Sequence, residues 1–234
     1  MQAPAGMIQP GKTAVIVAGG SGTRMGSTTP KQFLLLKGKP LLWYTIRAFL
    51  DAYADMQIVL VLPEAHMETG KAIAGEFSNA AIQIIAGGDT RFASVKNGVM
   101  ASPDDTIIFV HDGVRCLVTP ELIRTCYTQT VAKGSAVPAV ASTDSVRLSA
   151  ADGSHQVVDR QFVQIIQTPQ TFSAQVLKAA FQQDYQDVFT DEATVVEAAG
   201  GVVHLIAGDY SNIKVTRPID LLMAERILEE RNSL

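Results

Sequence analysis

The chain has 234 residues, of which 47% are hydrophobic and 18% are charged. This composition is typical of a single α/β domain with a large buried core, and it excludes a disordered chain. A net charge of −4 gives no general attraction to nucleic acid or to an anionic membrane. Neither is an expected partner, so any phosphate ligand must be met by local cations.

The two cysteines, Cys116 and Cys126, lack the spacing and the histidine partners of a zinc site, and they cannot form a disulfide framework. The first residues show no charged start followed by an apolar run, so we expect no signal peptide. No stretch approaches the roughly 18 apolar residues of a membrane span. These features predict a reduced, cytoplasmic protein.

Short β-rich runs alternate with amphipathic stretches along the chain. The stretch 40–52 places Leu42, Ile46 and Phe49 on one helical face, and Pro120 and Pro218 mark the first turns of two later helices. This alternation predicts a doubly wound, mostly parallel, Rossmann-like sheet that binds ligands beyond the carboxyl ends of its strands. The predicted strands are 13–18, 57–63, 82–88, 106–113, 135–141 and 202–208, and the predicted helices are 40–52, 65–77, 90–101, 119–132, 173–183, 191–199 and 218–230.

A segment at about 142–171 breaks the alternation. Two β-like pieces, 145–149 and 156–166, are joined by a turn signal at Asp152 and Gly153. We interpret the segment as a β-hairpin arm inserted into a single domain that spans 1–234. Because a two-stranded hairpin is marginally stable alone, it is expected to pack against another surface, and a second subunit is a candidate.

Two glycine-rich motifs match known nucleotide patterns only in part. Residues 6–13 read GMIQPGKT and satisfy the P-loop pattern, but a predicted strand follows the motif where a helix is required. The loop GGSGTRMG that follows this strand fails the dinucleotide pattern, because Gly26 comes one position too late. No acidic residue stands about 20 positions further on to bind a ribose. The sequence therefore favours neither a P-loop enzyme nor a dehydrogenase.

The same loop nevertheless has the chemistry of a phosphate site. Gly19, Gly20 and Gly22 allow backbone N–H groups to approach an anion closely, and Arg24 and Lys31 project from the same connection. Arginine offers a planar fork to phosphate oxygens and lysine a movable point charge. The loop is interpreted as a triphosphate clamp, and the alternative is a surface turn with two solvated cations.

The quoted loop and the PKQF motif after it resemble the N-terminal signature of nucleotidyltransferases. The later motifs VHDGVR, VDR, QTPQTF, TDEA and NIKVTRP follow in the order seen in the 2-C-methyl-D-erythritol 4-phosphate cytidylyltransferase family, over roughly residues 12–230. The resemblance implies transfer of the cytidylyl group of CTP to this polyol phosphate, in non-mevalonate isoprenoid biosynthesis. The D-ribitol 5-phosphate cytidylyltransferases share nearly every motif and are the alternative.

The resemblance also implies a role for each matching residue. Arg24, Lys31 and Lys214 would contact the phosphates of CTP, and Arg160 on the arm would reach the site of the partner in a homodimer. A divalent cation, with Mg²⁺ expected, would bridge the phosphates through protein ligands that the motifs do not identify. The residues implied at the nucleotide are Ala18, Gly19, Gly20, Gly22, Gly88, Asp89, Ser94 and Asp112, and those implied at the acceptor are Arg115, Ser145, Arg160, Thr168 and Thr190.

Three of the polar residues in these motifs also allow a structural explanation. Asp89 could be the N-cap of the helix predicted at 90–101. His111 is more typical of a packed, hydrogen-bonded histidine than of a catalyst, and Arg160 could be a surface charge on an exposed strand.

Three positions depart from the family pattern. Cys116 stands where proline is usual, which is expected to loosen the loop that carries Arg115. Ser145 keeps the hydroxyl of the usual threonine without its methyl group. Ser211 stands where an acidic residue is common, so a carboxylate metal ligand is not expected there.

Overall fold

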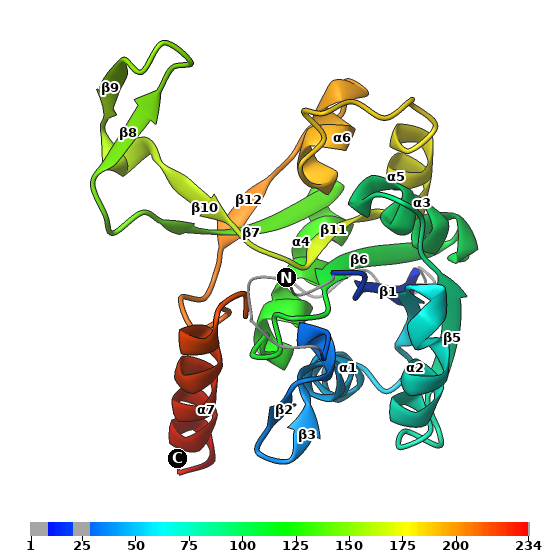
Figure 1. Ribbon diagram of the computed structural model, residues 1–234. Coiled ribbons are helices and arrows are strands. Elements are labelled where there is room, and N and C mark those ends of the chain that lie inside the picture. The colour runs from blue at the N-terminus through cyan, green and yellow to red at the C-terminus, as the bar shows by residue number, and fades with distance from the viewer. Residues whose placement is uncertain (1–8, 21–28, 234) are drawn as a thin grey trace.

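A mixed, largely parallel sheet forms the centre of the chain, of which the computed structural model describes residues 9–20 and 29–233 (Figure 1). Within these residues the sheet has eight strands in the order β10-β7-β11-β6-β1-β4-β5, with β12 paired to β7. Strands β10 and β11 are antiparallel to their neighbours, and the other pairs are parallel. The predicted doubly wound, mostly parallel sheet is confirmed. The strands are β1 (Gly11–Val17), β4 (Gln57–Leu62), β5 (Ala81–Ala86), β6 (Thr106–Asp112), β7 (Ser135–Ala141), β10 (Gln164–Ile166), β11 (Gln170–Ser173) and β12 (Leu205–Ala207).

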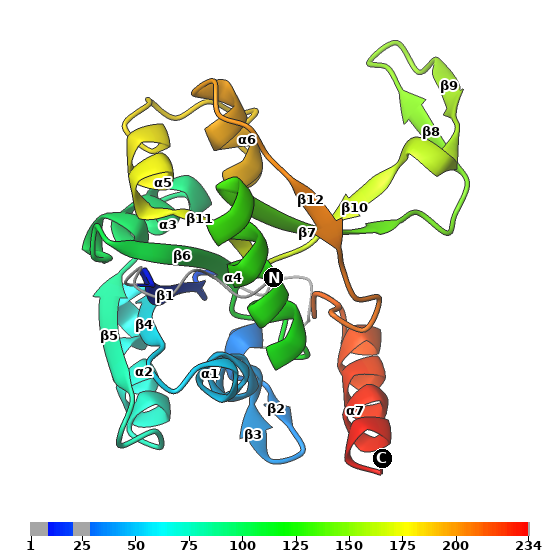
Figure 2. The same cartoon turned by 180° about the vertical axis from the view of Figure 1, so that it is seen from behind.

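In the described part of the chain, helices α1 to α6 cover the two faces of the sheet (Figure 2). Along β1, Ala14 and Ile16 pack in the core beneath α1, α2 and α4, whereas Val15 packs in the core beneath α3, α5 and α6. This alternation follows from the two-residue period of a strand and gives the two cores of a doubly wound sheet. The helices are α1 (Leu41–Ala52), α2 (Met67–Ala74), α3 (Arg91–Ala101), α4 (Pro120–Lys133), α5 (Ala174–Ala180) and α6 (Glu192–Ala198).

The register of the central strands brings their carboxyl ends to one level. Val17 at the end of β1 pairs with Val61 of β4 on one side and with Asp112 of β6 on the other. Whatever follows these strands in the chain therefore meets at one edge of the sheet. That edge is where a doubly wound fold binds its ligands.

The last helix, α7 (Pro218–Asn232), packs away from the sheet on a third apolar cluster. Its Ala224 is buried beside Leu36 and Leu117, near the small hairpin formed by β2 (Leu35–Leu36) and β3 (Lys39–Pro40). Arg231 donates from its guanidinium to the carbonyl oxygen of Leu117 at 2.7 Å. The end of the chain thereby supports the loop that follows β6.

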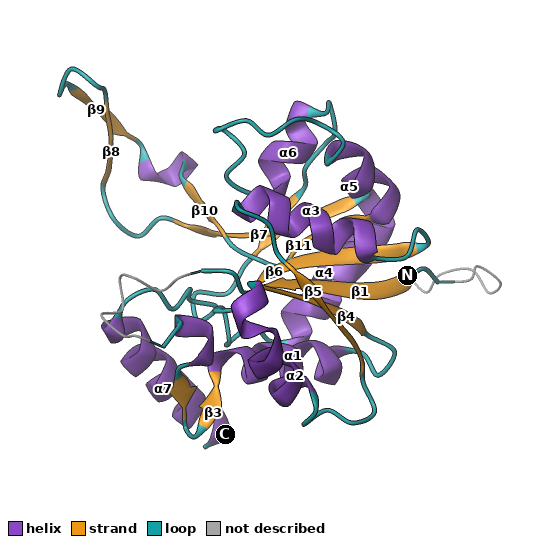
Figure 3. Cartoon of the chain, turned by 45° about the vertical axis from the view of Figure 1, so that its right-hand side comes forward, coloured by secondary structure: helices purple, strands orange, loops and turns teal. Residues whose placement is uncertain are grey.

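The inserted arm is a separate two-stranded hairpin, β8 (Val146–Ser149) paired with β9 (His155–Val158), that projects away from the sheet (Figures 1 and 3). Its turn has Gly153 at a φ of 83°, and Asp152 accepts a hydrogen bond from the backbone N–H of Ser154 at 2.9 Å, as the turn signal predicted. The predicted segment 142–171 also holds β10 and β11, which belong to the main sheet. The hairpin is therefore shorter than the predicted arm.

The apparent P-loop lysine has a structural role. Lys12 lies within β1, is 8% exposed and pairs with Asp55 at 2.9 Å, with the rings of Tyr53 and Tyr127 each 5.0 Å from its ammonium group. These contacts lie at the start of β1, so the P-loop interpretation is excluded. Of the helices in the described part of the chain, none combines the length and apolar character that crossing a membrane would need.

Candidate active site

A cleft of about 650 Å³ opens at the carboxyl ends of the central strands. It is built from the segments that follow β1, β4, β5 and β6, joined by Lys31 from the short 3₁₀ helix Lys31–Phe33 and by Lys214 from the segment before α7. Segments that are far apart in the chain thus meet in one site. The sequence-predicted residues in its lining are Ala18, Gly19, Gly20, Lys31, Gly88, Asp89, Ser94, Asp112 and Lys214. Gly22 and Arg24 lie outside the described residues.

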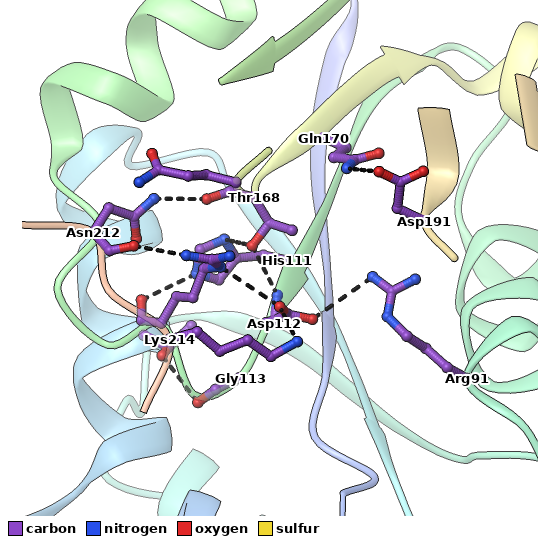
Figure 4. Close-up of polar contacts among 12 residues, drawn as sticks. Arg91, His111, Asp112, Gly113, Thr168, Gln170, Asp191, Asn212 and Lys214 are labelled. Carbon is purple, nitrogen blue, oxygen red and sulfur yellow. Dashed lines mark hydrogen bonds and ion pairs between the residues drawn. The ribbon is translucent and has the colours of Figure 1, made fainter. Parts of the chain in front are cut away.

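The carboxylate of Asp112 is the centre of the charged part of the cleft (Figure 4). Lys214 Nζ lies 2.9 Å from Asp112 Oδ2, Arg115 Nε lies 3.6 Å from the same oxygen, and Arg91 lies 3.6 Å from Oδ1. Burial alone would raise the pKa of Asp112, but the positive charges of Arg91, Lys214 and Arg115 outweigh it and hold the pKa well below its usual range. Three cations from three segments therefore converge on one ionised carboxylate.

The segment after β5 folds tightly against the start of α3. Gly88 donates its backbone N–H to Ser94 Oγ at 3.1 Å, and a Cβ at Gly88 would lie 2.5 Å from the Cβ of Ala93. Only glycine allows this close approach, which leaves backbone groups at the surface of the cleft. The N-cap of α3 is Thr90, which accepts from Ala93 N at 3.0 Å, so the interpretation of Asp89 as the N-cap is wrong.

Gln32 fixes the start of the glycine-rich loop through a buried hydrogen bond. Its side-chain amide donates to the carbonyl oxygen of Ala18 at 2.7 Å, and Gln32 is only 1% exposed. Ala18 in turn donates its N–H to Val61 O at 3.0 Å, which keeps the chain in line with β4. The glutamine of the PKQF motif thus has a structural explanation, since Gln32 fixes the position at which Gly19 and Gly20 enter the cleft.

His111 is a buried, hydrogen-bonded residue behind the cleft. Its Nδ1 lies 3.0 Å from Thr168 Oγ1, and its Nε2 lies 3.1 Å from the carbonyl oxygen of Arg115. Because Thr168 Oγ1 accepts from the N–H of Asp112, its own proton goes to Nδ1, and Nε2 donates to Arg115. Burial lowers the pKa of His111 to about 4, so the ring is neutral. The structural explanation of His111 is supported.

Arg115 lies beside Asp112 but, within the described residues, is not part of the cleft lining. Its guanidinium donates to the carbonyl oxygen of Asn212 at 2.8 Å, and its backbone N–H donates to Asp112 O at 3.0 Å. The substitution at Cys116 therefore leaves a loop that is well held, contrary to expectation. Cys116 itself is 4% exposed, and burial raises its thiol pKa to about 12.

The other residues implied at the acceptor lie at different distances from this centre. Thr168 is buried and contacts Asp112, as described above, whereas the described lining of the cleft does not include Ser145, Arg160 or Thr190. Ser145 lies at the base of the arm. Arg160 begins the 3₁₀ helix Arg160–Phe162 and donates to Thr143 O at 2.9 Å. One chain by itself therefore brings together the nucleotide residues and part of the acceptor set.

Sequence reasoning missed a second ion pair in the site, between Arg91 and Glu192. Arg91 donates to Glu192 Oε1 at 2.7 Å and to Oε2 at 3.3 Å, and Glu192 is completely buried. A signal was present, because a cation in the first turn of a helix opposes the helix dipole and calls for an explanation. The partner could not be found from spacing, since it lies 101 residues away.

A doubly wound sheet with a cation-lined cleft at its carboxyl edge is typical of proteins that bind phosphate-bearing ligands, and comparison with known proteins places this chain among the nucleotidyl-transferring enzymes. A family model described as 2-C-methyl-D-erythritol 4-phosphate cytidylyltransferase matches residues 12–230. The chain belongs to this family of cytidylyltransferases of the non-mevalonate pathway.

Individual relatives agree with the family model. Proteins of the same description from Bacteroides fragilis and Porphyromonas gingivalis are 42% and 44% identical, over 93% and 92% of this chain and 99% and 96% of their own. The solved 4-diphosphocytidyl-2C-methyl-D-erythritol synthase of Anaerococcus prevotii superposes with a TM-score of 0.82 at 25% identity, covering 94% of this chain and 97% of the other. The corresponding values for the Thermus thermophilus cytidylyltransferase are 0.73 and 27%, with coverage of 92% and 98%.

Proposed function

We propose that the cleft around Asp112 is where this cytidylyltransferase joins the cytidylyl group of CTP to 2-C-methyl-D-erythritol 4-phosphate. The observation that supports this assignment is the convergence of Lys214, Arg115 and Arg91 on one carboxylate, beside Lys31. Glu192 offsets the charge of Arg91. Lys31, Lys214 and Arg115 together still exceed the charge of Asp112, so this part of the cleft favours an anionic ligand. A nucleoside triphosphate and a phosphate monoester together supply that charge.

The nucleotide is proposed to lie along the segments that follow β1 and β5. Backbone groups beside Ala18, Gly19 and Gly88 can pair with the edge of a pyrimidine, and Asp89 and Ser94 lie next to them in the lining. The triphosphate would extend over Gly20 toward Lys31, with Gly22 and Arg24 on the same loop. Lys214 would approach the α-phosphate from the opposite side.

The chemistry proposed for this arrangement is an in-line displacement at the α-phosphorus. An oxygen of the acceptor phosphate forms the new bond to phosphorus, and the bond to the β-phosphate oxygen breaks, so pyrophosphate leaves with the electron pair. The attacking oxygen is already anionic near neutral pH and needs no general base. The cations hold two mutually repelling anions together and stabilise the charge of the transition state.

A magnesium ion is proposed to accompany the nucleotide. The described residues contain no group of three or more histidine, cysteine, aspartate or glutamate side chains able to hold a metal. Mg²⁺ needs no such cage, because it commonly binds through substrate phosphates and water with only one or two carboxylates. When bound, the ion would neutralise phosphate charge.

The binding site for the acceptor is proposed to be completed by residues from a second copy of the chain. Arg160 and Ser145 lie on the arm segment, away from the cleft of their own chain, while Thr168 and Thr190 belong to the body. The arm exposes Leu148, Val157 and Phe162 at 56%, 70% and 84%. Large apolar side chains on a projecting hairpin favour burial against a partner. A homodimer would place Arg160 of one subunit at the acceptor of the other.

Incubating the purified protein with CTP, Mg²⁺ and each polyol phosphate tests the proposal. Formation of 4-diphosphocytidyl-2-C-methyl-D-erythritol and pyrophosphate, lost on chelation and restored by added Mg²⁺, is the expected result. Turnover with D-ribitol 5-phosphate alone would contradict the acceptor assignment, and undiminished turnover after chelation would contradict the metal.

A further inference from the structure

Arg91 lines the cleft and forms an ion pair with the buried carboxylate of Glu192. Glu192 has 0% exposed side-chain surface, and both of its oxygens accept from the Arg91 guanidinium, at 2.7 and 3.3 Å. Such a two-point pair fixes the plane of the guanidinium as well as its position. Because Glu192 lies in the first turn of α6, Arg91 at the start of α3 is tied to a second helix that packs on the same face of the sheet.

The first turn of α6 is itself held in place from the sheet. Gln170 on β11 donates from its amide nitrogen to Asp191 at 2.9 Å (Figure 4). Its amide oxygen accepts from the N–H of Ala193 at 2.7 Å. The carboxylate of Glu192 between these two residues is therefore part of a preorganised frame. A frame of this kind is what holds a ligand-binding side chain to one geometry.

Stability alone does not explain the pair. A buried ion pair is weak evidence for stability, because desolvation offsets most of its attraction, and a cation in the first turn of α3 also opposes the helix dipole. Arg91 moreover keeps 35% of its side chain exposed and lines the cleft. A guanidinium has five N–H donors, and the hydrogen bonds to Glu192 use two of them. Donors therefore remain for a ligand.

Asp112, the other charged neighbour of Arg91, indicates what kind of ligand group these donors bind. Asp112 Oδ1 lies 3.6 Å from the guanidinium, so a donor and an acceptor stand side by side in the cleft (Figure 4). A hydroxyl group can accept from the one and donate to the other at the same time, which a phosphate cannot. Both proposed substrates carry free hydroxyl groups, CTP on its ribose and the polyol phosphate on its carbon chain. The acceptor is favoured because Asp112 is in contact with Thr168, which is implied at the acceptor.

We propose that Arg91 is an acceptor-contacting residue, which donates a hydrogen bond to a hydroxyl oxygen of the polyol, and that Glu192 is its positioning residue. This inference rests on the proposed function of the cleft. The Arg91–Glu192 pair then contributes to specificity for the acceptor, while binding of CTP depends on other residues.

The test compares three variants by steady-state kinetics with CTP and 2-C-methyl-D-erythritol 4-phosphate varied separately. Arg91→Met is expected to raise the acceptor KM on the order of 10- to 100-fold, as for loss of a charge-assisted hydrogen bond, and to leave the CTP KM within about threefold. Arg91→Met combined with Glu192→Gln removes both charges, so no carboxylate is left buried and unpaired. Arg226→Met, at a residue 71% exposed on α7, is the matched control.

The double variant separates binding from structure. We expect it to recover most of the thermal stability lost in Arg91→Met and to keep the raised acceptor KM. Recovery of the wild-type acceptor KM in the double variant, or a rise in the CTP KM instead, would overturn the inference. Acceptor analogues that each lack one hydroxyl give a second readout: the wild type should discriminate against one of them and the double variant should not. Absence of wild-type turnover would instead overturn the proposed function, and this inference with it.

Discussion

The contact between Lys214 and Asp112 shows that the cations of the site are already positioned before any substrate binds. Their 2.9 Å contact neutralises one cation, while Arg91 and Arg115 stand further from the same carboxylate, at 3.6 Å. In the proposed reaction, an incoming phosphate would compete with Asp112 for these cations and would not need to recruit them from water. The cost of assembling like charges is therefore met during folding, which is the principle of a preorganised electrostatic site.

Replacement of Lys31 by alanine is expected to lower kcat on the order of 10²- to 10³-fold, as for removal of one preorganised donor to the transition state. Lys31 lines the cleft at the start of a 3₁₀ helix, so we expect an unchanged far-UV circular dichroism spectrum. The control is Lys71→Ala on α2, where the lysine is 58% exposed and pairs with Glu68. A Lys31 variant with the kcat of the Lys71 variant would argue against the clamp.

His111 makes the fold sensitive to acid. Its folded pKa of about 4 lies below the usual value of 6.5, so the unfolded chain binds a proton between these pH values that the native chain does not. Stability is therefore lost as pH falls through this window, by about 2–3 kcal/mol at pH 4.5. Denaturant titrations from pH 7 to 4.5 should show a shallower pH dependence for His111→Asn than for the wild type. Parallel curves would contradict a neutral buried ring.

Helix α3 lies unusually close to the sheet at Gly98. A Cβ at this position would lie 2.4 Å from Val15 Cγ1 and 2.9 Å from Val61 Cγ2, on two stiff β-branched side chains of β1 and β4. Although alanine is the better helix former, Gly98→Ala is expected to destabilise the protein by about 1–3 kcal/mol through overpacking. Equilibrium unfolding measures the change, with Met100→Ala on the same helix as control, expected within about 0.5 kcal/mol. A stabilised Gly98→Ala would show that α3 can shift.

The elements themselves could largely be predicted from the sequence, because periodicity and end signals act locally. Thr119 caps α4 with Pro120 at its first position, as predicted, and Pro218 begins α7. Strand β11 was missed because a strand of four residues shows too little alternation to be recognised. The role of β10 was misjudged for a related reason, since its pairing with β7 depends on tertiary contacts rather than on local pattern.

The assembly of two chains can be tested by complementation. If Arg160 serves the site of the partner, Arg160→Ala and Lys31→Ala proteins, each impaired alone, should regain activity when mixed under subunit exchange. A mixed dimer contains one site with both native residues, so about a quarter of wild-type activity is expected at random pairing of equal amounts, counting half of the dimers and half of their sites. No recovery, although exchange is demonstrated by a labelled subunit, would contradict the shared site.

The site as a whole was harder to predict than the fold. The motif order identified Lys31, Gly88, Asp112 and Lys214, and the structure brings these residues to one cleft. Arg91 with Glu192 could not be predicted from spacing, because the partners meet only when α3 and α6 are packed on the same face of the sheet. Likewise, Arg115 is close to Asp112 in the sequence, but nothing local indicates that Arg91 and Lys214 reach the same carboxylate.

Because Lys214 lies late in the chain, its contact with Asp112 can form only near the end of synthesis. A ribosome releases Gly19, Gly88 and Asp112 well before Lys214, and Arg231, which supports the loop after β6, emerges later still. A nascent or truncated product that ends before the lysine would keep the segments after β1, β5 and β6, and it would lack both Lys214 and the part of the apolar cluster that α7 supplies. Such a fragment is expected to be inactive, because the cleft is complete only when the last segment of the chain has been synthesised and packed.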